Sequence, residues 1–159
     1  MSEIFTSVFD VIGKVRKATE ECENKQEGFE VRAEDGPTLF SQGVTQALTF
    51  YLYKVGDLKK LENVYCTLFN DEGTCKELNE QNDKICSYLD NEGYALYTAV
   101  LLHFLRKLEV KCEVTNLSND VGECVKDVSA KEAKIYRKLI EHMIELKKVS
   151  KIMIGQVSE

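Results

Sequence analysis

A stretch of sixteen residues, from Thr38 to Tyr53, contains no charged side chain, although Asp, Glu, Lys and Arg make up 30% of the whole sequence. Pro37 directly precedes this stretch, and because its fixed φ suits the first turn of a helix, we expect a helix to begin there. Apolar side chains then recur every three or four residues, which predicts a stripe that packs on the core. This stripe comprises Phe40, Val44, Ala47, Leu48, Tyr51 and Val55.

The opposite side of this expected helix is polar but uncharged. An ordinary surface helix would present Lys and Glu there, because charged side chains are readily solvated. We therefore expect this face to contact either the rest of the protein or a partner subunit. The candidate contact residues are Gln42, Gly43, Gln46, Thr49 and Tyr53.

The composition of the chain favours an all-α fold. A single proline and no tryptophan in 159 residues, together with abundant Lys, Glu and Leu, argue against many short strands joined by turns. We predict a single domain over residues 1–159, built as a bundle of about five to six helices. Periodicity places the most apolar helix at 94–108 and makes it the centre of the core. The pattern of residues 110–128 leaves a short strand and an irregular loop both open.

Local signals predict where several helices begin. Asp57 can cap a helix that follows Gly56, and Thr74 with Glu77 has the spacing of a capping box. Ser129 with Glu132 has the same spacing, so we expect the last helix to begin there. In contrast, the acidic segment 20–36 lacks helical periodicity. We expect a long exposed loop there, or a disordered one in the isolated protein.

Charge and hydropathy exclude some classes of function. The longest wholly apolar run, Ala99 to Leu102, is far below the roughly 20 residues needed to cross a bilayer, so we expect a soluble, cytoplasmic protein with no membrane partner. The net charge of −6 argues against indiscriminate binding to nucleic acid. However, residues 126–159 hold eight Lys or Arg against five Asp or Glu, so a local basic face could contact nucleic acid.

The six cysteines have no CxxC spacing, and neither histidine lies near a cysteine in the sequence, so we expect no metal site. Two interpretations stay open: buried free thiols, or one or two structural disulfides. The first candidates for pairing are Cys66, Cys75 and Cys86. Inside a cell, such disulfides would indicate a hyperthermophilic host.

No recognisable catalytic motif is present. His103 and His142 both lie on apolar stripes, where a packed histidine is more common than a catalytic base. We expect no enzymatic activity and no cofactor.

The last helix carries the candidate nucleic-acid contacts. Its cations gather opposite its apolar stripe, with Glu141 and Glu145 among them. One interpretation is a solvated face with ion pairs such as Arg137 with Glu141. The other is a ridge that contacts phosphates. The candidate RNA-binding residues are Lys134, Arg137, Lys138, Lys147, Lys148 and Lys151.

Two segments carry a family pattern: GPTLFSQGVTQALTFYLYK from Gly36 to Lys54, and ELKKVSKIMIGQ from Glu145 to Gln156. They resemble the small helical subunit of the type III-B Cmr complex, an archaeal antiviral CRISPR assembly guided by RNA. The resemblance implies a non-catalytic, all-helical subunit that stacks in several copies beside the subunits holding the guide RNA and helps bind target RNA. Its implied partners are other Cmr subunits, guide RNA, target RNA and further copies of itself.

Two alternatives of other classes stay open. A helical adaptor or regulator would use the uncharged helix for protein contact and never touch nucleic acid. A thiol-based sensor would require a reactive cysteine.

Overall fold

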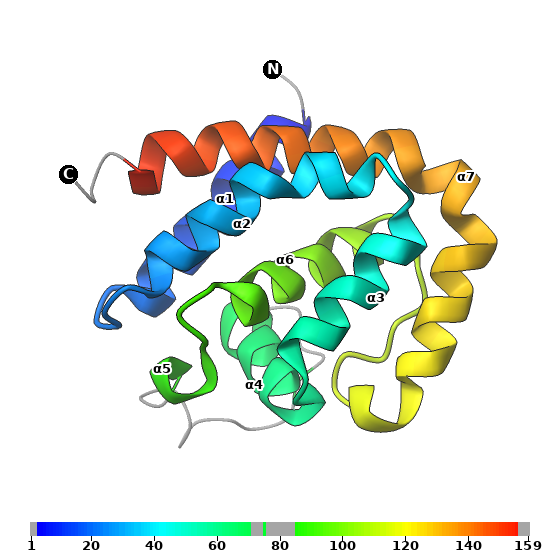
Figure 1. Ribbon diagram of the computed structural model, residues 1–159, viewed down its shortest axis with the longest axis horizontal. Helices are drawn as coiled ribbons and strands as arrows, with labels where there is room; N and C mark the ends of the chain where they lie inside the picture. Colours follow the sequence, from blue (N-terminus) through cyan, green and yellow to red (C-terminus); the bar gives the residue numbers. More distant parts are fainter. Residues whose placement is uncertain (1–2, 71–74, 76–84, 156–159) are drawn as a thin grey trace.

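The computed structural model describes residues 3–70, 75 and 85–155, and every regular element within them is helical. The all-α prediction is therefore confirmed for this part of the chain. The structure has seven α-helices there rather than five or six, followed by one turn of π-helix (Figure 1). The elements are α1 (Glu3–Thr19), α2 (Lys25–Phe40), α3 (Val44–Val55), α4 (Leu58–Phe69), α5 (Ile85–Tyr88), α6 (Tyr94–Lys107), α7 (Leu117–Ser150) and η3 (Lys151–Gly155).

Helix α6 lies at the centre of the bundle, as the sequence predicts. Every residue from Tyr94 to Leu105 is buried, and a helix that is buried on all sides must be surrounded by others. Figure 1 shows α6 in the middle of the molecule, with α3 and α4 beside it and α7 above. The buried side chains of all these helices form one hydrophobic core.

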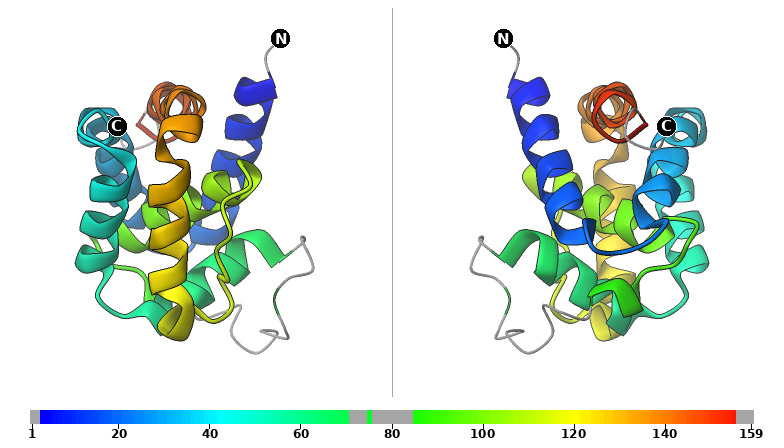
Figure 2. Two further views of the ribbon diagram at one scale, coloured as in Figure 1. Left: turned by 90° about the vertical axis from the view of Figure 1, so that its right-hand side faces the viewer. Right: turned by 90° about the vertical axis from the view of Figure 1, so that its left-hand side faces the viewer.

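Helix α7 is the longest element, with 34 residues. Figures 1 and 2 show that it runs along one side of the bundle, changes direction near its middle and then crosses the top, where α1 and α2 lie on either side of it. It begins at Leu117, so the prediction that the last helix starts at Ser129 is wrong.

The segment 110–128, for which the sequence allows either a strand or a loop, contains no strand. It is irregular up to Asn116 and helical from Leu117 onwards. The irregular part is held against α7 because the Lys111 amide donates a hydrogen bond to Asp127 at 2.6 Å. A disulfide between Cys112 and Cys124 adds a covalent link.

The expected loop over residues 20–36 is wrong, because α2 occupies Lys25–Phe40. The inward face of this helix shows no clear apolar periodicity in the sequence, since two of its buried residues, Gly28 and Gly36, have no side chain. Neighbouring elements pack directly on the α2 backbone at these two positions. The buried residues of α2 are Gly28, Phe29, Ala33, Gly36 and Phe40.

Pro37 lies inside the last turn of α2, so the prediction that a helix starts there is also wrong. The chain instead turns between Ser41 and Gly43, where Gly43 adopts a φ of +132° that residues with a Cβ rarely adopt. The new helix α3 then begins at Val44. Its predicted apolar stripe is confirmed, with Phe40 on α2 and all but Val55 of the α3 members buried.

The carboxylate that caps α3 comes from Glu132 on α7, 88 residues further along the chain. Its two oxygens accept hydrogen bonds from the amides of Val44 and Thr45, both at 3.0 Å, and the Thr45 hydroxyl donates a third. These hydrogen bonds, led by the one from the Thr45 side chain, lower the pKa of Glu132 below its usual value. Glu132, which the sequence assigned to a capping box on its own helix, thus caps a different one.

Removing this long-range cap is expected to destabilise the fold. Glu132→Gln should lower the free energy of unfolding by about 1 kcal/mol at neutral pH, the usual cost of losing a helix cap. Because folding lowers the pKa of Glu132, the stabilising contribution of its carboxylate is fully present above the unfolded-state pKa of about 4.3. It is lost as the pH falls through the lower folded-state pKa. Urea unfolding at pH 7 and pH 3 measures it.

A matched control for this variant is Glu123→Gln, also on α7. Glu123 is exposed and pairs with the exposed Lys126 at 3.4 Å, so its replacement should change stability little at either pH. If Glu132→Gln and Glu123→Gln behaved alike, the carboxylate of Glu132 would not cap α3 in solution.

All six cysteines form disulfides, which join Cys22 to Cys86, Cys66 to Cys75 and Cys112 to Cys124. Of the three cysteines singled out from the sequence, Cys66 and Cys75 therefore pair with each other, whereas Cys86 pairs across 64 positions with Cys22.

Two further expectations concern helix starts and membrane spans. Asp57 caps α4 as predicted, because its carboxylate accepts hydrogen bonds from the amides of Lys59 and Lys60. The capping box of Thr74 and Glu77 lies outside the described residues.

Within the described ranges, none of the helices is both long and apolar enough to cross a membrane.

Candidate nucleic-acid interface

Five of the six candidate RNA-binding cations lie exposed along the outer side of the second half of α7 and the start of η3. We call them the basic ridge: Lys134, Arg137, Lys138, Lys148 and Lys151. The last four follow Lys134 by three, four, fourteen and seventeen residues, which keeps all five near one side of the helix. At 1.5 Å per residue the ridge is about 25 Å long. Figure 2 shows this part of α7 at the top of the molecule, between α1 and α2.

Most of the ridge cations are available to an external anion. Lys134, Arg137, Lys138 and Lys151 make no ion pair within the part of the chain that the structure describes. Lys148 is the exception, since its Nζ lies 3.6 Å from a carboxylate oxygen of Glu145. The pair of Arg137 with Glu141, which the interpretation as a solvated face gave as an example, is not formed, so the ridge is less neutralised than a face of paired charges would be.

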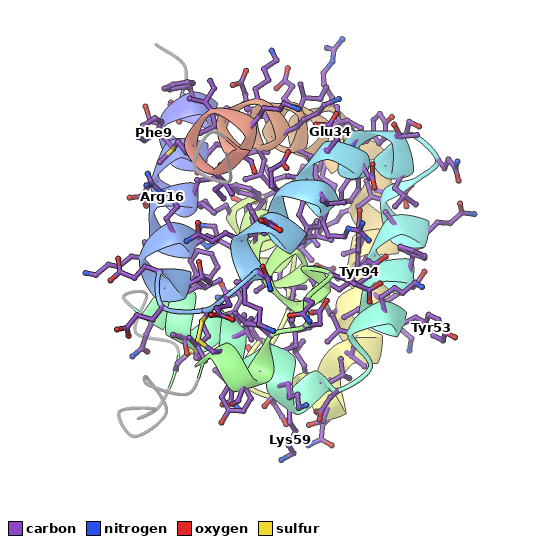
Figure 3. The ribbon with its side chains drawn as sticks, turned by 60° about the vertical axis from the view of Figure 1, so that its left-hand side comes forward. Phe9, Arg16, Glu34, Tyr53, Lys59 and Tyr94 are labelled. Atoms are coloured by element: carbon purple, nitrogen blue, oxygen red, sulfur yellow. A yellow bond between two sulfur atoms is a disulfide. The ribbon has the colours of Figure 1, made fainter. Side chains whose placement is uncertain are left out.

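The sixth candidate cation, Lys147, faces α2 instead. Its Nζ lies 3.6 Å from a carboxylate oxygen of Glu34, and both side chains are a little over 40% exposed. This pair links α7 to α2 at the edge of the ridge. Glu34, labelled in Figure 3, belongs to an acidic outer side of α2 that also includes the exposed Glu27 and Asp35. A polyanion on the ridge would therefore be repelled from the α2 side and favoured along α7 itself.

The candidate contact residues on α3 are also at the surface. Gln42, Gln46 and Thr49 are exposed, Gly43 is half-buried, and Tyr53 is 80% exposed and projects outward in Figure 3. Apart from the half-buried Gly43, these residues are thus not covered by the described part of the chain. An exposed aromatic side chain at the end of an uncharged face is a common anchor of protein contacts.

The two candidate surfaces meet where α7 changes direction. Glu132 contacts the first residues of α3, and the ridge begins two residues later at Lys134. Tyr53 lies at the other end of α3, about 14 Å from Val44 along the helix axis. A partner on the polar face and a nucleic acid on the ridge could therefore occupy the molecule together.

Both histidines are part of the core rather than of either surface. The ring of His103 stacks on that of Phe69 with centroids 4.1 Å apart. Nδ1 of His142 lies 2.7 Å from the carbonyl oxygen of Lys138, and burial lowers the pKa of the His142 imidazole. Each histidine is less than 10% exposed. Both therefore have a packing role, as their positions on apolar stripes predict.

The described residues also contain no group of three or more His, Cys, Asp or Glu side chains that could hold a metal ion.

Comparison of the chain with family models, with curated proteins and with solved structures found no match.

Proposed function

We propose that this protein is a non-catalytic small subunit of a type III-B (Cmr) CRISPR interference complex in the cytoplasm of its host. In this role it stacks along the filament of guide RNA and target RNA and helps bind the target RNA. The observation that carries the proposal is the basic ridge, since four of its five cations make no ion pair with the described residues and lie on one side of a single helix. The assignment to a Cmr complex, rather than to another RNA-binding assembly, rests on the sequence resemblance.

The electrostatics of the chain fit a subunit that works within an assembly. A single copy has a net charge of −6, so its ridge alone should bind RNA weakly. Several copies stacked side by side would present several ridges to one RNA, and binding at one ridge would raise the effective concentration of RNA at the next. The three disulfides agree with a hyperthermophilic host, whose intracellular proteins can retain them.

Capture of the tagged protein from its host tests the complex. Gentle elution followed by mass spectrometry and RNA sequencing should recover other Cmr subunits and short guide RNAs. Recovery of the protein with unrelated proteins and no RNA would reject the proposal.

Reversing the charge of the ridge is expected to weaken target RNA binding by the assembled complex. Replacing Lys134, Arg137, Lys138 and Lys151 with Glu should reduce the affinity at least about tenfold. The salt dependence of binding should also become shallower, by about 0.7 in log K per log salt for each phosphate of single-stranded RNA that the variant no longer neutralises. Filter binding at several salt concentrations measures both quantities.

A control variant with the same change in net charge distinguishes direct contact between the ridge and RNA from the effect of the protein's overall charge. Arg16, Lys17, Lys59 and Lys60 are exposed cations on α1 and α4, outside the ridge. Their replacement with Glu should leave the salt dependence unchanged. An equal fall in affinity in both variants would show that the ridge does not contact RNA.

A second candidate function is a helical adaptor or regulator without nucleic-acid contact. The observation that favours it is the exposed, uncharged face of α3, with Tyr53 at its end. A double variant with Gln46→Glu and Tyr53→Glu should then abolish capture of the partner, while ridge reversal should have no effect. If the chain is a Cmr subunit that uses both surfaces, each variant should impair the complex.

A further inference from the structure

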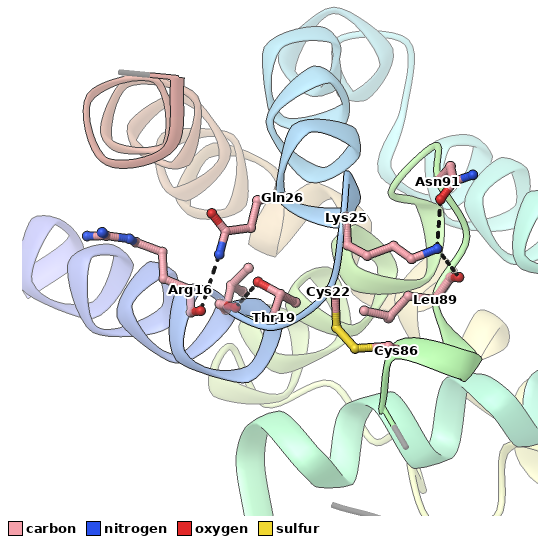
Figure 4. The surroundings of a disulfide bond; sticks show 9 residues. Arg16, Thr19, Cys22, Lys25, Gln26, Cys86, Leu89 and Asn91 are labelled. Carbon is pink, nitrogen blue, oxygen red and sulfur yellow. Dashed lines mark hydrogen bonds between the residues drawn. A yellow bond between two sulfur atoms is a disulfide. The ribbon is translucent and has the colours of Figure 1, made fainter. Parts of the chain in front are cut away.

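The three disulfides differ in how far their cysteines are buried. Cys112 and Cys124 are 6% and 1% exposed, and Cys66 is 5% exposed. Only the pair Cys22 and Cys86 joins two cysteines that are both partly exposed. This pair connects the turn between α1 and α2 to α5, as Figure 4 shows.

Each cysteine of this pair lines its own surface hollow. Cys86 lines a hollow of about 510 Å³ together with Lys14, Ala18 and Thr67. Cys22 lines a different hollow of about 180 Å³, formed by residues of the α1–α2 turn and by Ile154. The two cysteines of this pair therefore face different hollows on the surface.

We propose that Cys22–Cys86 is a site of thiol–disulfide exchange with small-molecule thiols such as glutathione, and that it opens while the rest of the protein stays folded. A thiolate attacks Sγ of Cys86 from the hollow beside it, which forms a mixed disulfide and releases the Cys22 thiolate. A second thiolate then attacks the external sulfur of the mixed disulfide and releases the Cys86 thiolate. Two external thiols are oxidised to one disulfide, and the protein disulfide is reduced to two thiols.

The other two pairs lack one requirement of this reaction. Cys112 also lines a surface hollow, but attack there would release a thiolate at Cys124, which is buried among apolar side chains. Burial disfavours a thiolate, so such a leaving group departs slowly. In the same way, attack at Cys75 would leave the thiolate on the buried Cys66. Among the three pairs, only Cys22–Cys86 joins two cysteines that are both partly exposed and that both line a hollow.

The contacts around this disulfide explain why it can open locally. Nζ of Lys25 donates hydrogen bonds to the carbonyl oxygen of Leu89 at 3.0 Å and to Oδ1 of Asn91 at 2.7 Å (Figure 4). Next to them, the backbone of Gly28 packs directly on that of Gly93. These contacts hold the start of α2 against the segment 89–93 without the disulfide. The two thiols should therefore stay close and form the bond again on oxidation.

A timed reduction of the folded, oxidised full chain tests the proposal. Samples taken during incubation with reduced glutathione are quenched with N-ethylmaleimide, and peptide mass spectrometry identifies the labelled cysteines. Cys22 and Cys86 should be labelled at least tenfold faster than the other four, while the circular dichroism spectrum stays unchanged. Low urea should accelerate labelling of Cys66, Cys75, Cys112 and Cys124 but not of Cys22 and Cys86. Simultaneous labelling of all six, or earlier labelling of another pair, would overturn the proposal.

Single variants test access to the sulfur atoms directly. Cys22→Ser leaves a free thiol at Cys86, and Cys112→Ser leaves one at Cys124. When both variants have the native circular dichroism spectrum, oxidised glutathione should modify Cys86 at least tenfold faster than Cys124. Equal rates would show that the hollow beside Cys86 does not admit a thiol reagent. If either variant failed to fold, the timed reduction of the unaltered chain would still decide the question.

Discussion

Replacing Gly93 with alanine is expected to lower the free energy of unfolding by about 2 to 4 kcal/mol, from backbone strain and overpacking together. Gly93 has a φ of +82°, and a Cβ there would lie 2.2 Å from the carbonyl carbon of Gly28. That neighbour is backbone, so it cannot move aside as a flexible side chain could. Urea unfolding followed by circular dichroism measures the loss.

The variant Gly28→Ala separates the steric part of this effect from the conformational part. Gly28 lies inside α2, where alanine is otherwise the better residue, but its Cβ would lie 2.3 Å from the carbonyl oxygen of Asn91. We therefore expect Gly28→Ala to destabilise the protein too, although less than Gly93→Ala.

Two other helical glycines serve as controls. A Cβ at Gly13 on α1 or at Gly122 on α7 would meet nothing within 4 Å. Alanine at either position should raise the stability by up to about 1 kcal/mol, because glycine is a poor helix former. If Gly93→Ala were as stable as these controls, α2 would not pack on the start of α6 as the structure shows.

The same glycines show why part of the fold could not be predicted from the sequence. Helices α3 and α6 were predictable because their buried residues are apolar and recur at helical spacing. Helix α2 buries Gly28 and Gly36 as well as three apolar residues, and a glycine carries no hydrophobic signal. For Gly36 the neighbour is a side chain, since a Cβ there would lie 1.9 Å from the hydroxyl oxygen of Tyr97. Only the tertiary neighbour shows that such a position faces inward.

The start of α3 was missed for a related reason. Pro37 and the uncharged run together suggested one helix, but the break at Gly43 is stabilised by Glu132, which is distant in the sequence. Ser129 and Glu132 have the spacing of a local capping box, yet that spacing also occurs inside a longer helix. A local motif shows which hydrogen bonds are available but not which distant partner uses them.

The candidate interface was predictable to a greater extent. Exposure of the ridge follows from helical periodicity, which placed Lys134, Arg137 and Lys138 opposite the apolar stripe. The orientation of Lys147 toward Glu34 did not follow, because it depends on where α2 lies. Likewise, the pairing of Cys22 with Cys86 across 64 residues could not be deduced, since six cysteines allow fifteen pairings.

Complete reduction of the three disulfides is expected to have the largest effect of all on stability. Each disulfide contributes about 2 to 4 kcal/mol in typical proteins, chiefly by restricting the unfolded chain in the entropic account. The three together are comparable to the whole stability of a typical domain, about 5 to 15 kcal/mol. For a chain of this size, the loss corresponds to a fall in Tm of roughly 15 to 40 °C. Thermal unfolding with and without a strong reductant measures it.

Variants that lack some of the disulfides should show how much of this fall in Tm each disulfide accounts for. A double variant with Cys22→Ser and Cys86→Ser should retain the fold, since the contacts of Lys25 and the packing of Gly28 on Gly93 remain, and should show only part of the Tm difference. Replacing all six cysteines with alanine should give a Tm close to that of the reduced protein. A change in Tm below about 5 °C on complete reduction would show that the three pairs do not stabilise the protein in solution. In that case the proposed exchange at Cys22–Cys86 would have no structural consequence.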